Sequence, residues 1–212
     1  MKENQKCPYV VLYEDEDVLC VYKKQNVFTV KTDDKRTFTH NLFYYLKKDV
    51  LKKNEELFVL HRLDYETSGI VLFVKSKRMH ALLQREFLQR RVIREYEAVI
   101  KEDIFLHEQY EVHQLLSDSR NVVSQTTGKE AITFFEATNP IQIGTALKIQ
   151  IKTGRKNQIR IALHDCGFTL IGDKRYSHST AKRMYLNEFH LGFSSSCPLK
   201  VHDFFLPPLW IK

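Results

Sequence analysis

The hydrophobic and polar positions along the chain predict many strands and few helices. Short apolar runs, several of them alternating with polar residues, are typical of β-strands. They occur at residues 9–13, 18–22, 57–61, 70–75, 92–100, 110–116, 131–137, 145–152, 185–193 and 199–205. Apolar residues at helical spacing predict helices over 37–48 and 77–90, and a third helix that follows Thr153 and ends near Gly167.

The order of these elements indicates the fold class. Strands outnumber helices and do not alternate strictly with them, so we predict an α+β fold with a central, mostly antiparallel sheet and flanking helices. The chain has 212 residues, enough for one substantial core, and no Gly/Ser/Pro-rich linker. We therefore interpret residues 1–212 as a single domain.

One polar segment separates two of the predicted strands. Residues 61–69, His-Arg-Leu-Asp-Tyr-Glu-Thr-Ser-Gly, lie between two apolar runs. If Asp64 is shielded from water, it needs a cationic, hydrogen-bonding partner to stay ionised, and Arg62 and Arg160 are the available cations. Held in this way, the carboxylate would serve as a nucleophile or a general base. The alternative is a solvated loop in which Arg62, Asp64 and Glu66 pair with one another.

A second polar segment follows the strand predicted at 145–152. Residues 153–160, Thr-Gly-Arg-Lys-Asn-Gln-Ile-Arg, form a turn that leads into the third helix. We expect Arg155, Lys156 and Arg160 in the first turns of that helix. Backbone N–H groups, the helix dipole and side-chain charge would then coincide, which predicts an anion-binding site.

The composition favours a polyanionic partner. The chain has 33 Lys and Arg against 26 Asp and Glu, a net charge of +7 and a pI near 9.1. Its apolar runs are far shorter than the ~20 residues that span a bilayer. The four cysteines have no Cys-x-x-Cys spacing, and the first residues are polar. We therefore expect a soluble, cytoplasmic protein with reduced thiols.

Other catalytic and metal-binding arrangements are not favoured. His164 and Cys166, two residues apart on a helix, point in different directions, and no ligand cluster has the spacing of a zinc site. Glycine-rich nucleotide-binding motifs are absent from the sequence. Asp64 and Glu66 could form a glycosidase pair, but acids one residue apart give no information on the separation that this reaction needs.

The two polar segments, in this order and at this spacing, resemble the RluA-type pseudouridine synthases. The first matches the family signature H-R-L-D-x-x-T-S-G, with Lys75 after it. The second matches the block T-G-R-x-H-Q-I-R, which continues with Gly172, Asp173 and Tyr176. Between them, residues 94–98 resemble the family's K-x-Y-x-A strand. The resemblance spans nearly the whole chain.

The resemblance implies a pseudouridine synthase fold with an RNA-binding cleft, and isomerisation of a uridine in structured rRNA or tRNA without a cofactor or a metal. Asp64 would be the catalytic carboxylate, Tyr96 would stack on the target base and take part in proton transfer, and Arg160 would pair with Asp64. Arg62 would fill the gap left by the flipped base. The residues expected to bind substrate RNA are His61, Arg62, Thr67, Ser68, Arg155, Lys156, Asn157 and Gln158.

Several positions depart from the family's pattern. Its usual histidines are replaced by Asn157, Ala162 and Asn187, and its K-P-x-G motif reads Lys-Lys-Gln-Asn over 23–26. Only sixty residues precede His61, so we expect no S4-like RNA-binding module there. We also expect a monomer that recognises RNA through its catalytic domain.

Two functions from other classes remain as alternatives. The missing histidines would suit a catalytically weak or inactive RNA-binding module that keeps the fold. Such a module would bind RNA in a salt-dependent manner and form no pseudouridine. An enzyme acting on free nucleosides or glycosides would turn over a small substrate without RNA, and the basic composition argues against it.

Overall fold

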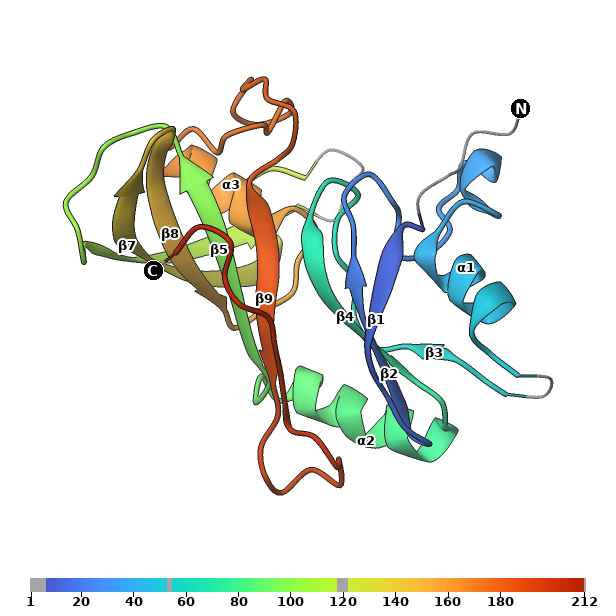
Figure 1. Cartoon of the computed structure of the whole chain (residues 1–212). Helices are drawn as coiled ribbons and strands as arrows, with labels where there is room; N and C mark the ends of the chain where they lie inside the picture. Colours follow the sequence, from blue (N-terminus) through green and yellow to red (C-terminus); the bar gives the residue numbers. More distant parts are fainter. Residues whose placement is uncertain (1–6, 53–54, 118–121, 212) are drawn as a thin grey trace. The chain divides into compact units, whose positions relative to one another are not determined.

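A computed structural model of the chain describes residues 7–52, 55–117 and 122–211 (Figure 1). Contacts within the chain gather into two compact units. Unit 1 comprises Met1–Arg91 and Phe193–Phe204, and unit 2 comprises Val92–Gly192 and Phe205–Lys212. Both units contain strands and helices that do not alternate strictly, which confirms the α+β class. The interpretation of 1–212 as a single domain stays a prediction.

Unit 1 is built on antiparallel strands in the hydrogen-bonded order β1 (Tyr9–Glu14), β2 (Val18–Lys23) and β4 (Ser68–Val74), with β3 (Phe58–Val59) also paired to β4. The predicted hairpin is confirmed. β3 is shorter than the predicted strand 57–61. It ends there because the Leu72 N–H of β4, next in the ladder, donates to the His61 side chain instead of a strand carbonyl.

Two α-helices and a short 3₁₀ helix complete unit 1. They are η1 (Lys35–Thr37), α1 (Leu42–Asp49) and α2 (Lys77–Leu88). The helix predicted over 37–48 begins only at Leu42, because the Asn41 side chain accepts the Tyr44 N–H at 2.9 Å and caps it there. Phe43 of α1 packs against Phe73 of β4, with ring centroids 6.3 Å apart.

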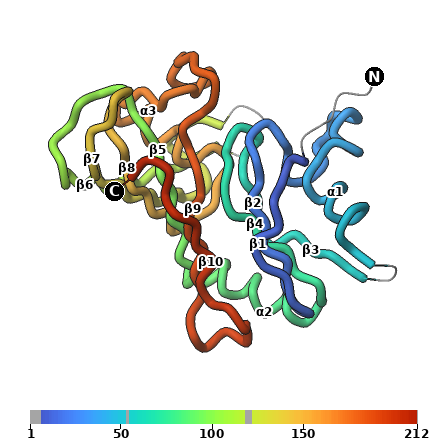
Figure 2. The backbone as a smooth tube through the Cα atoms, viewed as in Figure 1, coloured from blue at the N-terminus to red at the C-terminus, as the bar shows by residue number. Residues whose placement is uncertain are grey.

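Unit 2 contains five antiparallel strands in the order β9-β5-β8-β7-β6, traced as a tube in Figure 2. Their bounds are β5 (Ile93–Ile100), β6 (Gln109–Leu116), β7 (Lys129–Ile141), β8 (Gly144–Ile151) and β9 (Leu186–Gly192). α3 (Gln158–Asp165) packs against β6 and β7. β10 (Asp203–Phe205), of which only Phe205 belongs to unit 2, covers only part of the predicted strand 199–205.

The third helix starts later than the sequence suggested. Asn157 has a left-handed backbone with a φ of 56°, which interrupts the helical path, and α3 begins at the next residue. Arg155 and Lys156 therefore precede the helix, and only Arg160 lies in its first turn. None of the helices in the described ranges has the length and hydropathy of a membrane-spanning segment.

Candidate active site

The loop that carries Asp64 connects β3 to β4, and its backbone is tied to the segment after β2. The Thr29 hydroxyl donates to the Leu63 carbonyl at 2.9 Å and accepts the Leu63 N–H at 3.1 Å. On the other side of Asp64, the Asn26 N–H donates to the Tyr65 carbonyl at 2.9 Å. Asp64 itself is half-buried. Its carboxylate is thus carried by a backbone that is fixed at both neighbouring residues.

Lys23, at the end of β2, is fully buried next to this loop. Its ammonium donates to three main-chain carbonyls, one of them that of Tyr65 at 3.4 Å. Burial lowers the pKa of Lys23 to about 7, and the negative charges of Asp64 and Glu66 oppose this shift. Lys23 was not among the predicted site residues. Its signals were its position at the end of an apolar strand and its match to the lysine of the family's K-P-x-G motif.

The other signature residues of the loop occupy different environments. His61 is buried, accepts a main-chain N–H of β4 at Nε2 at 3.1 Å, and stacks on Phe87 of α2 with centroids 5.5 Å apart. Because Nε2 accepts, the neutral ring carries its proton on Nδ1. Thr67 and Ser68 are buried as well, whereas Arg62 is exposed. An RNA contact by any of these four residues stays a prediction.

In unit 2, Tyr96 of β5 belongs to a buried polar cluster with Arg94 and Glu188. Arg94 donates from Nε to Oε1 of Glu188 at 2.9 Å, from Nη2 to Oε2 at 3.3 Å, and from Nη2 to the Tyr96 hydroxyl. Burial raises the pKa of Glu188, while the charge of Arg94 opposes the shift. The cluster fixes the direction of the Tyr96 phenol. Sequence reasoning missed Glu188, because its place opposite Tyr96 depends on the register of β5 and β9.

The turn at Thr153 and Gly154 reaches the same cluster. A Cβ atom on Gly154 would lie 2.9 Å from Nη1 of Arg94, closer than such contacts normally allow. Glycine therefore permits the turn to approach the guanidinium. The structure thus brings together the start of the second polar segment and the strand that carries Tyr96.

Arg160 is bound by Asp173 inside unit 2. Its Nε and Nη2 each donate to one carboxylate oxygen at 2.8 Å, and Nη1 donates to Oδ1 of Asn157 at 3.0 Å. The side chains of Arg160 and Asp173 are 3% and 0% exposed. Burial raises the pKa of Asp173, but the hydrogen bonds and charge of Arg160 outweigh it and hold this pKa below its usual range. The predicted pairing of Arg160 with Asp64 stays a prediction.

Asn157 stands where the family's pattern has histidine, and it keeps a bridging role. Besides accepting from Arg160, its Nδ2 donates to the Tyr176 hydroxyl at 3.0 Å. That hydroxyl donates in turn to the Val122 carbonyl at 3.0 Å. The Arg160 guanidinium carbon lies 5.1 Å from the Tyr176 ring centroid. The amide therefore supports both partners of this interior contact.

Gln158 joins the turn to the sheet. Its Oε1 accepts from the Thr153 hydroxyl at 2.8 Å and from the Arg155 N–H at 3.0 Å, and its Nε2 donates to β7. Arg155 also donates from Nε to the Glu130 carbonyl at 2.9 Å. Two donors of the expected anion site are thus engaged by the protein, while Lys156 is exposed. The anion site stays a prediction.

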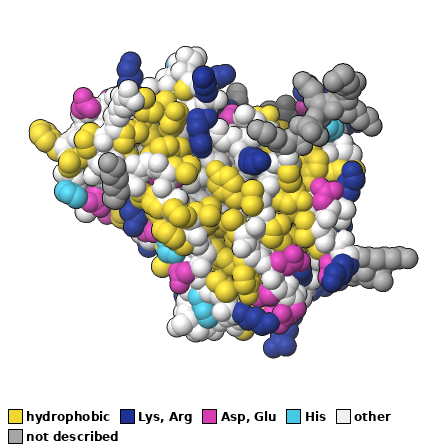
Figure 3. Space-filling model, in the orientation of Figure 1, with side chains coloured by type: hydrophobic (Ala, Val, Ile, Leu, Met, Phe, Trp, Pro, Cys, Tyr) yellow, Lys and Arg dark blue, Asp and Glu magenta, His cyan; other side chains and the backbone are white. Residues whose placement is uncertain are grey.

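The positive charge is not concentrated on the visible face of the molecule. Figure 3 shows Lys and Arg side chains scattered over that face among hydrophobic and acidic ones. Within the residues that the structure describes, no group of three or more His, Cys, Asp or Glu side chains could hold a metal ion.

The chain is similar to known RNA pseudouridine synthases. A family model described as RNA pseudouridylate synthase matches residues 17–165. A ribosomal large subunit pseudouridine synthase D from Blochmanniella floridana is 27% identical over 93% of this chain and 66% of its own length. An uncharacterized RNA pseudouridine synthase from Helicobacter pylori (strain ATCC 700392 / 26695) is 32% identical over 84% of this chain and 68% of its own length. The chain spans about two thirds of the length of these relatives.

A solved structure has the same fold. The chain called Human RNA Pseudouridylate Synthase Domain Containing 1 matches with a TM-score of 0.74 and 19% identity, over 94% of this chain and 83% of that one. A second human chain, RNA Pseudouridylate Synthase Domain Containing 4, matches with a TM-score of 0.69 and 16% identity, over 94% and 88%. At these identities the likeness concerns the fold alone.

Proposed function

The chain belongs to the RNA pseudouridylate synthase family, isomerases that act on uridine in RNA, and we propose that it converts a specific uridine of rRNA or tRNA to pseudouridine with Asp64 as its catalytic carboxylate. The observation that carries this proposal is the Asp64 loop. Its sequence is that of the family signature, and its backbone is fixed at Leu63 and Tyr65, on both sides of the half-buried carboxylate. Such fixation favours a group that must meet a substrate in one geometry.

The reaction balances without an added reagent. The bond between uracil N1 and ribose C1′ breaks, the base rotates, and a bond forms between C5 and C1′. N1 gains a proton and C5 loses one, so the product has the atoms of the substrate. In our proposal Asp64 either adds to the nucleoside or removes a proton from it. Lys23 lies close enough for the charge of Asp64 to oppose the lowering of the Lys23 pKa by burial.

Tyr96 is proposed to stack on the flipped uracil and to take part in the proton transfer. The hydrogen bond from Arg94 supports this role, because it fixes the phenol in one direction. Arg94 is in turn held by Glu188. A preoriented phenol loses little entropy when the base arrives.

Arg160 is proposed to pair with Asp64 while Asp173 and Asn157 hold its guanidinium. The hydrogen bonds to these two residues support this role, because they hold the guanidinium in one orientation. Arg62, which is exposed, is proposed to stack in the RNA where the uridine has left. The buried residues of the predicted RNA-binding set would act by holding these loops; they are His61, Thr67, Ser68, Asn157 and Gln158. Arg155 and Lys156 would line the path of the RNA.

The names of the relatives support an RNA substrate of the ribosome. Two related sequences are called ribosomal large subunit pseudouridine synthase D. We propose rRNA as the first substrate to test and tRNA as the second. Mapping of pseudouridines in total RNA from cells with and without the gene would identify the target.

The test of the function is pseudouridine formation by the purified protein. Wild-type protein is expected to form pseudouridine in unmodified rRNA or tRNA, and Asp64→Asn is expected to reduce this to background. Glu66→Gln is the matched control, because it removes another half-buried carboxylate of the same loop and should keep activity. Full activity of Asp64→Asn would show that another group does the chemistry. Salt-dependent RNA binding with no pseudouridine from the wild type would instead favour the non-catalytic module.

A further inference from the structure

Unit 1 contains a cavity next to the Asp64 loop that the proposed reaction does not use. Its volume is about 990 Å³, and it is lined by Cys7 and Pro8, by the segment after β2, by η1, by α1 and by Tyr65. Tyr65 follows Asp64 directly, and consecutive Cα atoms are about 3.8 Å apart. A group bound against Tyr65 would therefore contact the residue that follows Asp64 in the same loop.

One wall of this cavity is aromatic. The rings of Tyr65 and Phe28 lie with centroids 4.6 Å apart and planes inclined by 39°. The Phe28 backbone is held in place by the Leu42 N–H, which donates to its carbonyl at 2.8 Å. Tyr65 keeps 38% of its surface exposed although it is a large aromatic residue. A supported and partly exposed ring of this kind is a platform on which a nucleobase can stack.

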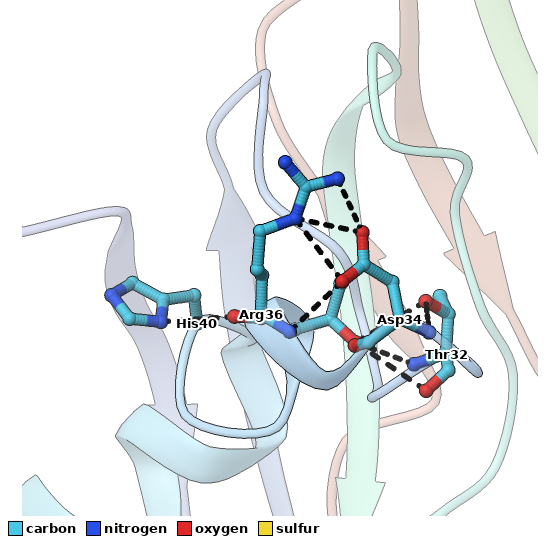
Figure 4. A network of polar contacts seen from close by, with 5 residues as sticks. Thr32, Asp34, Arg36 and His40 are labelled. Atoms are coloured by element: carbon cyan, nitrogen blue, oxygen red, sulfur yellow. Dashed lines mark hydrogen bonds and ion pairs between the residues drawn. The ribbon is translucent and has the colours of Figure 1, made fainter.

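A second part of the lining is a guanidinium held in one direction. Asp34 accepts from Nε of Arg36 at 3.0 and 3.1 Å and from Nη2 at 2.7 Å, as Figure 4 shows. Asp34 also accepts the backbone N–H of Arg36, which fixes the 3₁₀ turn. Among the described residues, Nη1 of Arg36 makes no hydrogen bond, and the side chain is 90% exposed. Nη1 and the adjacent Lys35 can therefore bind a phosphate.

The third feature is an acceptor on the same rim. Nδ1 of His40 lies 3.0 Å from the Arg36 carbonyl (Figure 4). The Thr39 hydroxyl lies 3.1 Å from the same nitrogen. A carbonyl only accepts, so the contact with Arg36 is a hydrogen bond in the tautomer that carries its proton on Nδ1, and in that tautomer Nε2 is an acceptor. A ribose 2′-hydroxyl is a donor that such a nitrogen can bind, and this group distinguishes RNA from DNA.

We propose that this cavity is a subsite for a nucleotide that flanks the target uridine, with its base on Tyr65, its phosphate at Arg36 and its ribose near His40. The inference rests on the proposed function for the identity of the RNA. It adds a binding site in unit 1 that would select the residue beside the isomerised one. Stacking is tolerant of base identity, so the subsite would prefer an unpaired nucleotide over a particular base.

The test uses the full-length chain and a fluorescein-labelled oligouridylate of twelve nucleotides, with affinity measured by anisotropy. Tyr65→Ala is expected to weaken binding at least about fivefold, as loss of a base–aromatic stack does, whereas Tyr65→Phe should bind like the wild type. Arg36→Ala should weaken binding and reduce the slope of log affinity against log salt by about one. His40→Ala should reduce the preference for oligouridylate over oligodeoxythymidylate.

Lys200→Ala is the matched control, because Lys200 is an exposed cation of unit 1 paired with Glu16 at 2.6 Å, as Arg36 is paired with Asp34. It should leave affinity and salt slope unchanged. Cross-linking of 4-thiouridine RNA should give peptides that contain Tyr65 or residues of η1. The subsite is refuted if Tyr65→Ala binds like the wild type, or if the wild type does not bind oligouridylate at low salt. These measurements need no isomerisation, so they stand apart from the test of Asp64.

Discussion

Both carboxylate oxygens of Asp173 accept from the guanidinium of Arg160, at 2.8 Å each, in the interior of unit 2. The two residues are thirteen positions apart, and neither side chain is more than 3% exposed. A buried guanidinium without such a partner would be costly, because its charge would lose hydration without compensation. Asp173 thus compensates the buried charge of Arg160 at the start of α3.

Removal of that partner should destabilise the protein strongly. Asp173→Asn leaves the Arg160 charge without its counter-ion, and the free energy of unfolding should fall by about 3–5 kcal/mol. Urea denaturation at neutral pH measures this change. Glu16→Gln, which breaks the exposed pair with Lys200, is the control and should change stability by less than about 1 kcal/mol. Equal effects of the two substitutions would contradict the importance of the interior pair.

The same pair predicts a dependence of stability on acid. The pKa of Asp173 is lower in the folded protein than its usual value, so the folded state binds this proton more weakly than the unfolded chain. The stabilisation is present above the usual pKa of an aspartate and is lost as pH falls through the lowered one. The stability difference between wild type and Asp173→Asn should therefore shrink as denaturation is measured at decreasing pH below about 4.

Lys23 predicts a dependence of the same sign, a rise of stability with pH, in the neutral to alkaline range. Its pKa is lowered by burial to about 7 from 10.5. Between these values the unfolded chain holds a proton that the folded protein has released, so stability should rise with pH. Lys23→Met lacks this group, and subtraction of its unfolding free energies at pH 7, 8 and 9 removes the contribution of other titrating residues. A difference that stays flat over this range would show that Lys23 remains charged when folded.

Glu188 should matter for catalysis through Arg94 and Tyr96. Without the carboxylate, the guanidinium is no longer held and the phenol loses its fixed direction, so Glu188→Ala should lower the single-turnover rate of pseudouridine formation at least about tenfold. RNA affinity should stay the same, which separates positioning from binding. Glu188→Gln keeps the shape and an acceptor oxygen and should lose less. Glu136→Gln, at a half-buried glutamate of β7, serves as control, and an equal loss in both would indicate a general effect.

The sequence predicted the elements of unit 1 better than their ends. The β1–β2 hairpin and the buried β4 follow from runs of apolar residues, which depend on local composition alone. The start of α1 depended on whether Asn41 or an earlier residue supplied the cap, and several polar residues near it could have done so. Single hydrogen bonds decide where a helix or strand ends, and the hydrophobic periodicity of the sequence does not reveal those bonds.

The candidate site was predictable where a short segment carries the chemistry. Asp64, Tyr96 and Arg160 stand out because each lies in a recognisable motif. Glu188 did not, and Lys23 matched only the first position of the K-P-x-G motif. A buried charge cannot be distinguished from a surface charge until the register of its strand is known. The partner of Arg160 was equally hidden, since Asp173 reaches it through the turn that follows α3.

The hydrogen bonds that hold the Asp64 loop involve the backbone of Leu63 and Tyr65 and not their side chains. The side chain at position 65 can therefore be exchanged while its carbonyl continues to accept from Asn26. Substitutions at position 65 can therefore change the surface proposed to contact a base without moving the Asp64 carboxylate. In such an arrangement new substrates can be acquired by single substitutions, at little risk to the chemical step itself.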